Sequence, residues 1–313
     1  MRRKDIDGIS GLMIVYMIFV HIVNFTHTGN FFVVLMRPLF FFMPWFFFKS
    51  GMFFFHKSNN QMFLEGKKLL YPYVKYSLYG IIVWSVILFF YGETSWVKYI
   101  LSPFYQILKE GAVMGNLPLW FLASLFVAKL MYNAICSQKY YLTLLFLCII
   151  AAYILDVINC NYIVWFGNIL SGLFFLGMGH LLKDVQYKKI VFIISTLFYV
   201  AYLSIPSLFS NVDMRANHCN HGYYLLCGSL SGIIMINNIF YYLPQNTSIL
   251  HAIGSKSMNY YVIHYLLLEV VILFSNKIFH VDIDSLLMVF ILSLNSFIVL
   301  PIIAKYVNTS RFI

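Results

Sequence analysis

The sequence predicts an all-α fold: a polytopic membrane bundle of about ten transmembrane helices with both termini in the cytoplasm. Of the 313 residues, 61% are hydrophobic and only 10% are charged, whereas a soluble domain usually carries about 25% charged residues. Apolar runs close to the roughly 20 residues needed to cross a bilayer recur from Gly8 to Tyr306, with short polar loops between them. No segment reads as a soluble domain, so we expect a single integral-membrane domain over residues 1–313.

Windows of about 20 apolar residues place the expected spans in order along the chain. They fall at 9–27, 31–55, 69–91, 117–135, 140–156, 162–182, 189–208, 222–242, 257–275 and 285–306. The second window contains Pro38 and Pro44, so we expect a kink or break there. The third has Pro72 in its first turn, where proline is tolerated.

The distribution of basic residues sets the expected orientation. With the amino terminus inside, thirteen lysines and arginines lie in inner segments, whereas the outer loops hold only Lys98, Lys109, Arg215 and Lys277. The net charge of +10 therefore lies beside the spans, so we expect the lipid bilayer as a partner and no nucleic acid. The run Arg2-Arg3-Lys4 precedes apolar sequence without a small-residue cleavage site, so we expect the first span to be retained.

Seven polar side chains lie within or at the edges of the apolar runs. A charged group there costs roughly 2.5–3.5 kcal/mol on translocon scales, so the default expectation is a polar site between helices. They are His21, Arg37, Lys49, Lys129, His180, His264 and Glu269.

His21, two-thirds through the first span, is the leading candidate for chemistry. Its imidazole can exchange protons near neutral pH, or it can bond a neighbouring helix for packing alone. In the ninth window, Ser257, Tyr261 and His264 share one helical face with Glu269 further along. That stripe is typical of a helix–helix seam as well as of a site.

Several other positions allow two interpretations each. Lys49 either faces a polar cavity or snorkels to the interface, and Ser50, next to Gly51, either lines a cavity or permits close helix approach. Trp120 either belongs to an interfacial aromatic belt or lines the cavity. Lys67 and Lys68 are either positive-inside anchors or a binding point for a phosphate-rich ligand.

Several enzyme classes lack their signatures. The chain has no GxSxG elbow, no Walker A loop and no HExxH motif. Its five cysteines show no CxxC or other metal-ligand spacing. We therefore expect no metal.

Taken together, the motifs resemble those of the membrane acyltransferase 3 family of bacterial integral-membrane O-acyltransferases. The resemblance covers essentially the whole chain and rests on the order of five pieces. They are Asp7-Gly8 with His21, Phe46-Phe47-Phe48-Lys49-Ser50-Gly51, Lys67-Lys68-Leu69-Leu70-Tyr71-Pro72-Tyr73, Pro118-Leu119-Trp120-Phe121-Leu122, and Ile253-Gly254-Ser255-Lys256-Ser257-Met258-Asn259-Tyr260-Tyr261-Val262-Ile263-His264.

The resemblance implies transfer of an acyl group, usually acetyl, from acyl-CoA to a hydroxyl of a carbohydrate or another envelope molecule, in the bacterial cytoplasmic membrane. His21 matches the family's essential first-span histidine, which would take the acceptor's proton or carry the acyl group. Lys67 and Lys68 would attract the CoA phosphates, and Lys49, Ser50, Trp120 and His264 would contact substrate. At two positions where the family carries basic residues, this chain has Ser10 and Glu65.

Two alternatives stand beside an active O-acetyltransferase. One is a transporter or flippase of lipid-linked sugar, for which paired broken helices in two related halves would be expected. The sequence shows one candidate break and no repeat. The other is a catalytically degenerate relative that binds CoA or glycan, which Ser10 and Glu65 would favour.

Overall fold

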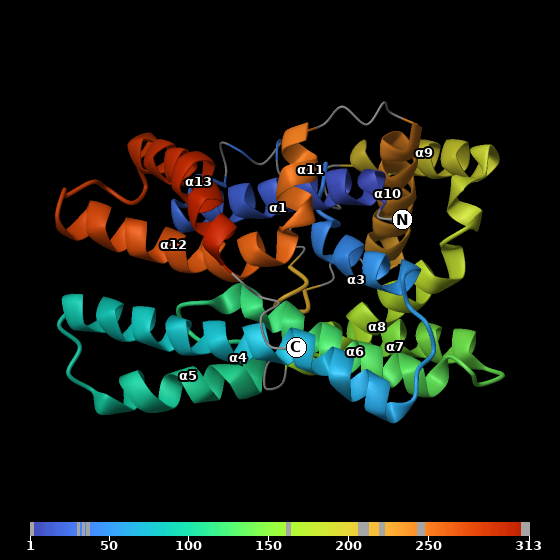
Figure 1. Ribbon diagram of the computed structural model, residues 1–313, viewed down its shortest axis with the longest axis horizontal. Helices are drawn as coiled ribbons and strands as arrows, with labels where there is room; N and C mark the ends of the chain where they lie inside the picture. The colour runs from blue at the N-terminus through green and yellow to red at the C-terminus, as the bar shows by residue number, and fades with distance from the viewer. Residues whose placement is uncertain are drawn as a thin grey trace. The chain divides into compact units, whose positions relative to one another are not determined.

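A computed structural model describes residues 3–29, 32, 35, 38–160, 164–205, 213–218, 223–242 and 248–307 of the 313-residue chain. Those residues are almost entirely helical (Figure 1). Within these ranges there is no β-strand, and the two isolated bridges join Val113 to Asn116 and Asp213 to His218. The all-α expectation is confirmed.

The chain divides into two compact units that each draw on separate stretches of sequence. Unit 1 contains residues 1–36, 70–119 and 246–313, and unit 2 contains residues 37–69 and 120–245. Helix α4 (Asn59–Phe90) contributes to both, because the division falls between Leu69 and Leu70.

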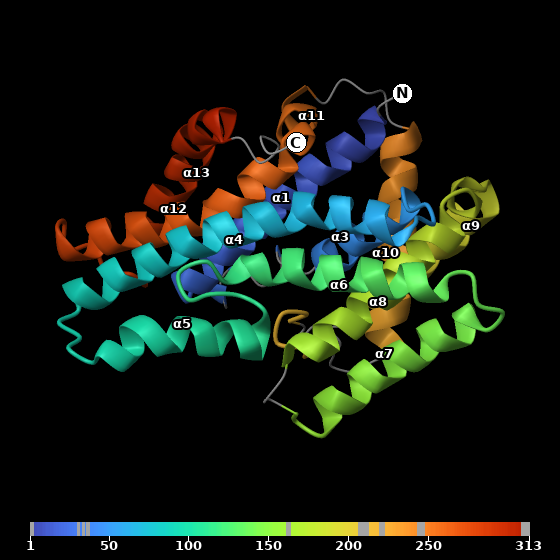
Figure 2. The same cartoon turned by 60° about the horizontal axis from the view of Figure 1, so that its bottom comes forward.

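Unit 1 is built around α1 (Lys4–Phe25), which contacts α11 (Ser248–Ser255), α12 (Ser257–Lys277) and α13 (Leu286–Tyr306). Its remaining elements are the second part of α4, α5 (Trp96–Glu110) and the short η1 (Leu117–Leu119). Helix α5 runs antiparallel beside α4 in both Figure 1 and Figure 2. It ends at Gly111, whose left-handed backbone (φ 74°) suits a glycine C-cap.

Unit 2 is built around α8 (Val164–Leu182), which contacts α3 (Phe42–Met52), α6 (Trp120–Ile135) and α7 (Tyr141–Val157). Helices α9 (Lys189–Leu203) and α10 (Tyr223–Tyr242), with the short η2 (Val185–Tyr187), complete it. Glycines on α8 let α3 approach closely: Gly172 lies against the ring of Phe47, and Gly179 against the backbone of Phe48.

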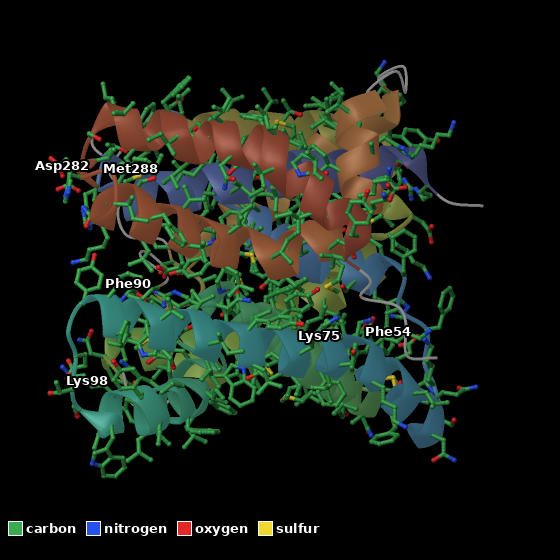
Figure 3. The ribbon with its side chains drawn as sticks, turned by 60° about the vertical axis from the view of Figure 1, so that its left-hand side comes forward. Phe54, Lys75, Phe90, Lys98, Asp282 and Met288 are labelled. Atoms are coloured by element: carbon green, nitrogen blue, oxygen red, sulfur yellow. The ribbon has the colours of Figure 1, made fainter. Side chains whose placement is uncertain are left out.

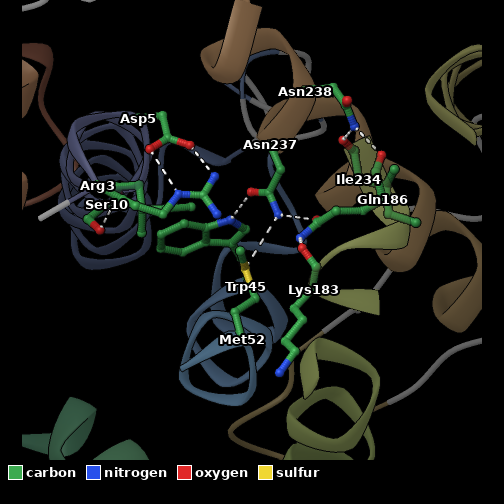
Figure 4. Close-up of polar contacts among 11 residues, drawn as sticks. Arg3, Asp5, Ser10, Trp45, Met52, Lys183, Gln186, Ile234, Asn237 and Asn238 are labelled. Carbon is green, nitrogen blue, oxygen red and sulfur yellow. Dashed lines mark hydrogen bonds and ion pairs between the residues drawn. The ribbon is translucent and has the colours of Figure 1, made fainter. Parts of the chain in front are cut away.

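A buried amide network fastens three elements of unit 2 (Figure 4). The Trp45 indole N–H donates to Asn237 Oδ1 at 2.9 Å, and Asn237 Nδ2 donates to Gln186 Oε1 at 2.8 Å. Asn238 Nδ2 donates to the Gln186 carbonyl at 2.8 Å. Because buried polar groups are costly when unpaired, these bonds fix α3, η2 and α10 in one arrangement.

Each of the ten predicted windows contains a helix, but ten membrane crossings are not confirmed. Six helical segments of the described residues are long and apolar enough to span a bilayer: Lys4–Phe25, Asn60–Phe90, Leu117–Ile135, Val164–Leu182, Ser257–Lys277 and Leu286–Tyr306. Three apolar helices are shorter: Tyr141–Val157, Lys189–Leu203 and Leu226–Tyr242. The cytoplasmic placement of the termini stays a prediction.

Two local expectations need comment. Pro72 does not open a helix, because α4 already begins at Asn59 in polar sequence that hydropathy windows exclude, which leaves Pro72 inside the helix. In the second window, Pro38–Phe41 form a turn and α3 begins at Phe42, so the expected break is present among the described residues. Arg37 lies outside the described residues.

The exposed surface carries many large apolar side chains. Phe297 on α13 and Leu197 on α9 are 71% and 66% exposed, as expected for surfaces that face lipid. Figure 3 shows Phe90, Lys98 and Asp282, all residues of unit 1, at one end of the view. There Lys98 pairs with Glu93, and His27 Nδ1 lies 2.7 Å from Asp284 Oδ1. Large apolar side chains exposed along the helices are typical of a membrane protein.

Candidate active site

Two histidines from helices far apart in sequence meet inside unit 1. His21 of α1 and His264 of α12 have ring centroids 5.2 Å apart, with 37° between their planes. His21 is half-buried, and His264 is 1% exposed. These two come from separate helices, and the structure brings them into contact within one unit. The other residues that the sequence predicts at the site are Lys49, Ser50, Lys67, Lys68 and Trp120.

The local helix structure fixes the orientation of His264. Its Nδ1 lies 2.7 Å from the Tyr261 carbonyl oxygen, one turn earlier on α12. Because a carbonyl only accepts, Nδ1 carries the hydrogen and the lone pair lies on Nε2. Nε2 is buried and has no hydrogen-bond partner among the described residues.

Aromatic rings surround the two imidazoles. The Tyr265 and His21 rings meet edge to face, with centroids 5.3 Å apart. The Tyr265 and Phe25 rings are tilted, with centroids 4.9 Å apart. The Tyr261 ring lies 6.1 Å from that of His264. Sequence reasoning missed Tyr265, although its position four residues after Tyr261 places it on the predicted polar face of the ninth span. The rings leave the imidazoles in an environment of low polarity.

Polar contacts with the segment before Trp120 hold α12 in place. The Tyr261 hydroxyl donates to the Pro118 carbonyl. Asn116, fully buried, donates through Nδ2 to the Val262 carbonyl at 3.1 Å. Gly115, with φ +79°, packs on Gly80 of α4. Sequence reasoning missed Asn116 as well, because its partners are backbone carbonyls that no motif identifies.

The other end of α1 is held by close backbone packing on α11. A Cβ added at Gly11 would collide with the Leu250 carbonyl, and one added at Gly254 would collide with the Asp7 carbonyl. Asp7 Oδ2 also lies 3.5 Å from His251 Nε2. Ser10 is fully buried here and donates to the Ile6 carbonyl at 2.6 Å. The packing of α1 on α11 fixes the helix that carries His21.

Three predicted substrate residues lie in unit 2. Trp120 is 4% exposed and packs among aromatic rings, 6.4 Å from that of Phe47. Lys49 and Ser50 are half-buried at the end of α3, and the Lys49 ammonium lies 5.5 Å from the Trp45 ring centroid. Their roles toward a substrate stay predictions.

Lys67 and Lys68 are both exposed in the first part of α4, also in unit 2. Glu65, one turn away, pairs with Lys57 and interacts electrostatically with Lys129 and Lys68. The acidic residue is therefore surrounded by lysines, and the cluster remains positive overall. Sequence reasoning missed Lys57 and Lys129 as members of this cluster, because they come from the α3–α4 loop and from α6.

The described residues contain no group of three or more His, Cys, Asp or Glu side chains that could hold a metal ion. Ammonium groups bind phosphate as point charges, so the lysine cluster has the charge that binding of an anionic ligand would require.

Comparison with known families identifies the class of protein to which this chain belongs. The model of a family described as an acyltransferase domain matches residues 3–305, which is essentially the whole chain and includes both units. The chain belongs to this acyltransferase family, and its apolar helices make it a multi-pass membrane acyltransferase. No curated protein and no solved structure matches it. The resemblance drawn from the sequence motifs is thereby confirmed.

Proposed function

We propose that this chain is an O-acetyltransferase that moves an acetyl group from acetyl-CoA to a hydroxyl of a cell-envelope carbohydrate or glycolipid, in the bacterial cytoplasmic membrane. The observation that carries the proposal is the contact between His21 and a buried His264, in a chain that belongs to an acyltransferase family. Burial of an ionisable side chain between apolar helices is costly, so such a residue is by default a functional-site candidate.

In the proposed reaction His21 is the general base. A ring nitrogen of His21 takes the proton of the acceptor hydroxyl as the hydroxyl oxygen attacks the thioester carbonyl. The new C–O bond forms, the C–S bond breaks, and the departing CoA sulfur receives the proton from His21. The products are the O-acetyl ester and free CoA, and the histidine returns to its starting form.

The donor's phosphates are assigned to Lys67 and Lys68. Both ammonium groups are exposed, and the neighbouring cluster around Glu65 has more lysines than acids. Exposed ion pairs contribute about 0.2–1 kcal/mol each, so the two lysines together account for up to roughly 30-fold in donor affinity. Lys49, Ser50 and Trp120 are proposed to contact substrate, and His264 to belong with His21.

The test is acetyl transfer from labelled acetyl-CoA to envelope glycans in membranes that hold equal amounts of native, His21→Ala and His27→Ala chains. His27 is the matched control because it is exposed and pairs with Asp284. A general base contributes about 10²- to 10⁴-fold, so His21→Ala should lose at least about 100-fold while His27→Ala keeps its activity. Equal label from all three chains would remove His21 from the chemistry. Binding of acetyl-CoA without transfer by the native chain would favour the degenerate relative.

The double variant Lys67→Ala/Lys68→Ala tests the donor site. The KM for acetyl-CoA should rise while kcat stays near native, because the lysines bind donor and transition state alike. Lys139→Ala, which changes a lysine outside this cluster, is the control. An unchanged KM in the double variant would remove both lysines from the donor site.

A further inference from the structure

The packing of His264 does not explain why its Nε2 atom is buried without a hydrogen bond to the described part of the chain. His264 is 1% exposed, yet its Nε2 has no hydrogen-bond partner among the described residues. A buried acceptor without a hydrogen bond destabilises the folded protein, because it has lost its contacts with water. A leucine or phenylalanine would fill the same space without that cost, so the nitrogen itself needs an explanation.

The tautomer of His264 makes Nε2 an acceptor. The Nδ1–H donates to the Tyr261 carbonyl at 2.7 Å, and a second carbonyl, that of Tyr260, lies 3.3 Å away. These contacts hold the hydrogen on Nδ1 and keep the Nε2 lone pair available. Because the carbonyls belong to the preceding turn of α12, the helix itself fixes the ring.

The separation of the two imidazoles suits a hydrogen bond between them. Two rings joined nitrogen to nitrogen have centroids about 5 Å apart, because the N···N distance is about 2.9 Å and each nitrogen lies about 1.1 Å from its ring centroid. The observed centroid distance is 5.2 Å, at an interplanar angle of 37°. This separation is short enough for an N–H group of His21 to reach Nε2 when the two rings are suitably oriented.

We infer that His264 is a positioning residue for His21: its Nε2 accepts an N–H of His21 and stabilises the imidazolium that forms when the other nitrogen of His21 takes the acceptor's proton. This inference rests on the proposed function. His264 stays neutral throughout, so the proton taken from the hydroxyl still leaves with the CoA sulfur and no further co-reactant is needed.

Two substitutions separate the nitrogens of His264. In His264→Asn the side-chain amide takes the place of Nδ1 and keeps a donor for the Tyr261 carbonyl, but nothing occupies the Nε2 position. In His264→Gln the amide reaches the Nε2 position with an acceptor oxygen, but the bond to Tyr261 is lost. If Nε2 acts on His21, the Gln variant should keep at least about tenfold more kcat than the Asn variant, with the acetyl-CoA KM near native in both. If His264 only anchors α12, the Asn variant should be equal or better, and the inference fails.

A second measurement does not depend on acyl transfer. Diethyl pyrocarbonate acylates unprotonated histidine nitrogens, and mass spectrometry reports its reaction at His21 in the full-length protein in detergent. A hydrogen bond from His21 to Nε2 makes the opposite nitrogen more nucleophilic. His21 should therefore react at similar rates in the native chain and His264→Gln, and several-fold more slowly in His264→Asn. Equal rates in all three would overturn the inference.

The two measurements together distinguish failure of the proposed function from failure of the inference about His264. If the native chain transfers no acetyl group but the order of His21 reactivity holds, the histidine pair stands and the proposed function falls. If transfer occurs and both orders fail, the function stands and the pair falls. Thermal unfolding of each variant identifies any chain that has not folded, and His264→Gln and His264→Asn then need comparison only with each other.

Discussion

The close packing of α1 on α11 makes a quantitative prediction for Gly254→Ala. A Cβ at Gly254 would lie 2.6 Å from the Gly11 backbone nitrogen and 2.8 Å from the Asp7 carbonyl carbon, whereas ordinary contacts begin near 3.4 Å. The obstacle is backbone, which cannot rotate away, so the overpacking cost should lie at the upper end of about 1–3 kcal/mol. Alanine regains about 0.8–1 kcal/mol of helix propensity. The net destabilisation should be about 2 kcal/mol.

The assay is equilibrium unfolding of the purified protein in detergent, followed by tryptophan fluorescence. Gly29→Ala is the matched control, because no atom lies within 4 Å of the added Cβ. Acetyl transfer should also fall in Gly254→Ala, since α1 carries His21 and α11 leads directly into α12, which carries His264. If Gly254→Ala and Gly29→Ala unfold at the same midpoint, the described contact between α1 and α11 is wrong.

Three further predictions use the same kind of comparison. Gly115 and Gly92 both have positive φ, but of these two only Gly115 lies against the backbone of Gly80. Gly115→Ala should therefore be about 1–3 kcal/mol less stable than Gly92→Ala. Equal stabilities of the two variants would contradict the described packing of Gly115. Asn237→Leu leaves the Trp45 indole and Gln186 Oε1 without their partner and should cost at least about 2 kcal/mol, whereas leucine at the exposed Asn24 should change the unfolding midpoint little. Burial raises the pKa of the Cys136 thiol, so a smaller fraction of this thiol is ionised near neutral pH in the folded protein. Iodoacetamide labelling of Cys136 should therefore need a higher pH in the folded protein than in the unfolded chain. Labelling curves that coincide for the folded and unfolded protein would refute this.

Hydropathy located the helices well because crossing a bilayer imposes a length and a composition. It failed where that constraint is absent. The polar first part of α4, residues 59–68, is helical although no window includes it, and α11 has only eight residues. Helix α5 was expected only as part of an outer loop, because its apolar residues lie on one face and charged Lys98 and Lys109 interrupt the run.

The candidate site was only partly predictable for a different reason. The polar stripe of the ninth span pointed to His264, and the first span pointed to His21, but their contact depends on which faces of α1 and α12 meet. Side-chain packing decides that, and no single-helix pattern records it. Likewise, Glu65 read as a missing basic residue, whereas the structure surrounds it with Lys57, Lys68 and Lys129 from three segments.

The buried position of Ser10 limits which side chains this position can hold. The resemblance to the family implies a basic residue at this position, but in this chain the position is fully buried and its neighbour Gly11 lies against the Leu250 backbone. A long cationic side chain at position 10 would have to separate packed helices before it could interact with a substrate. Ser10→Arg or Ser10→Lys should therefore destabilise this chain unless the surrounding packing also changes.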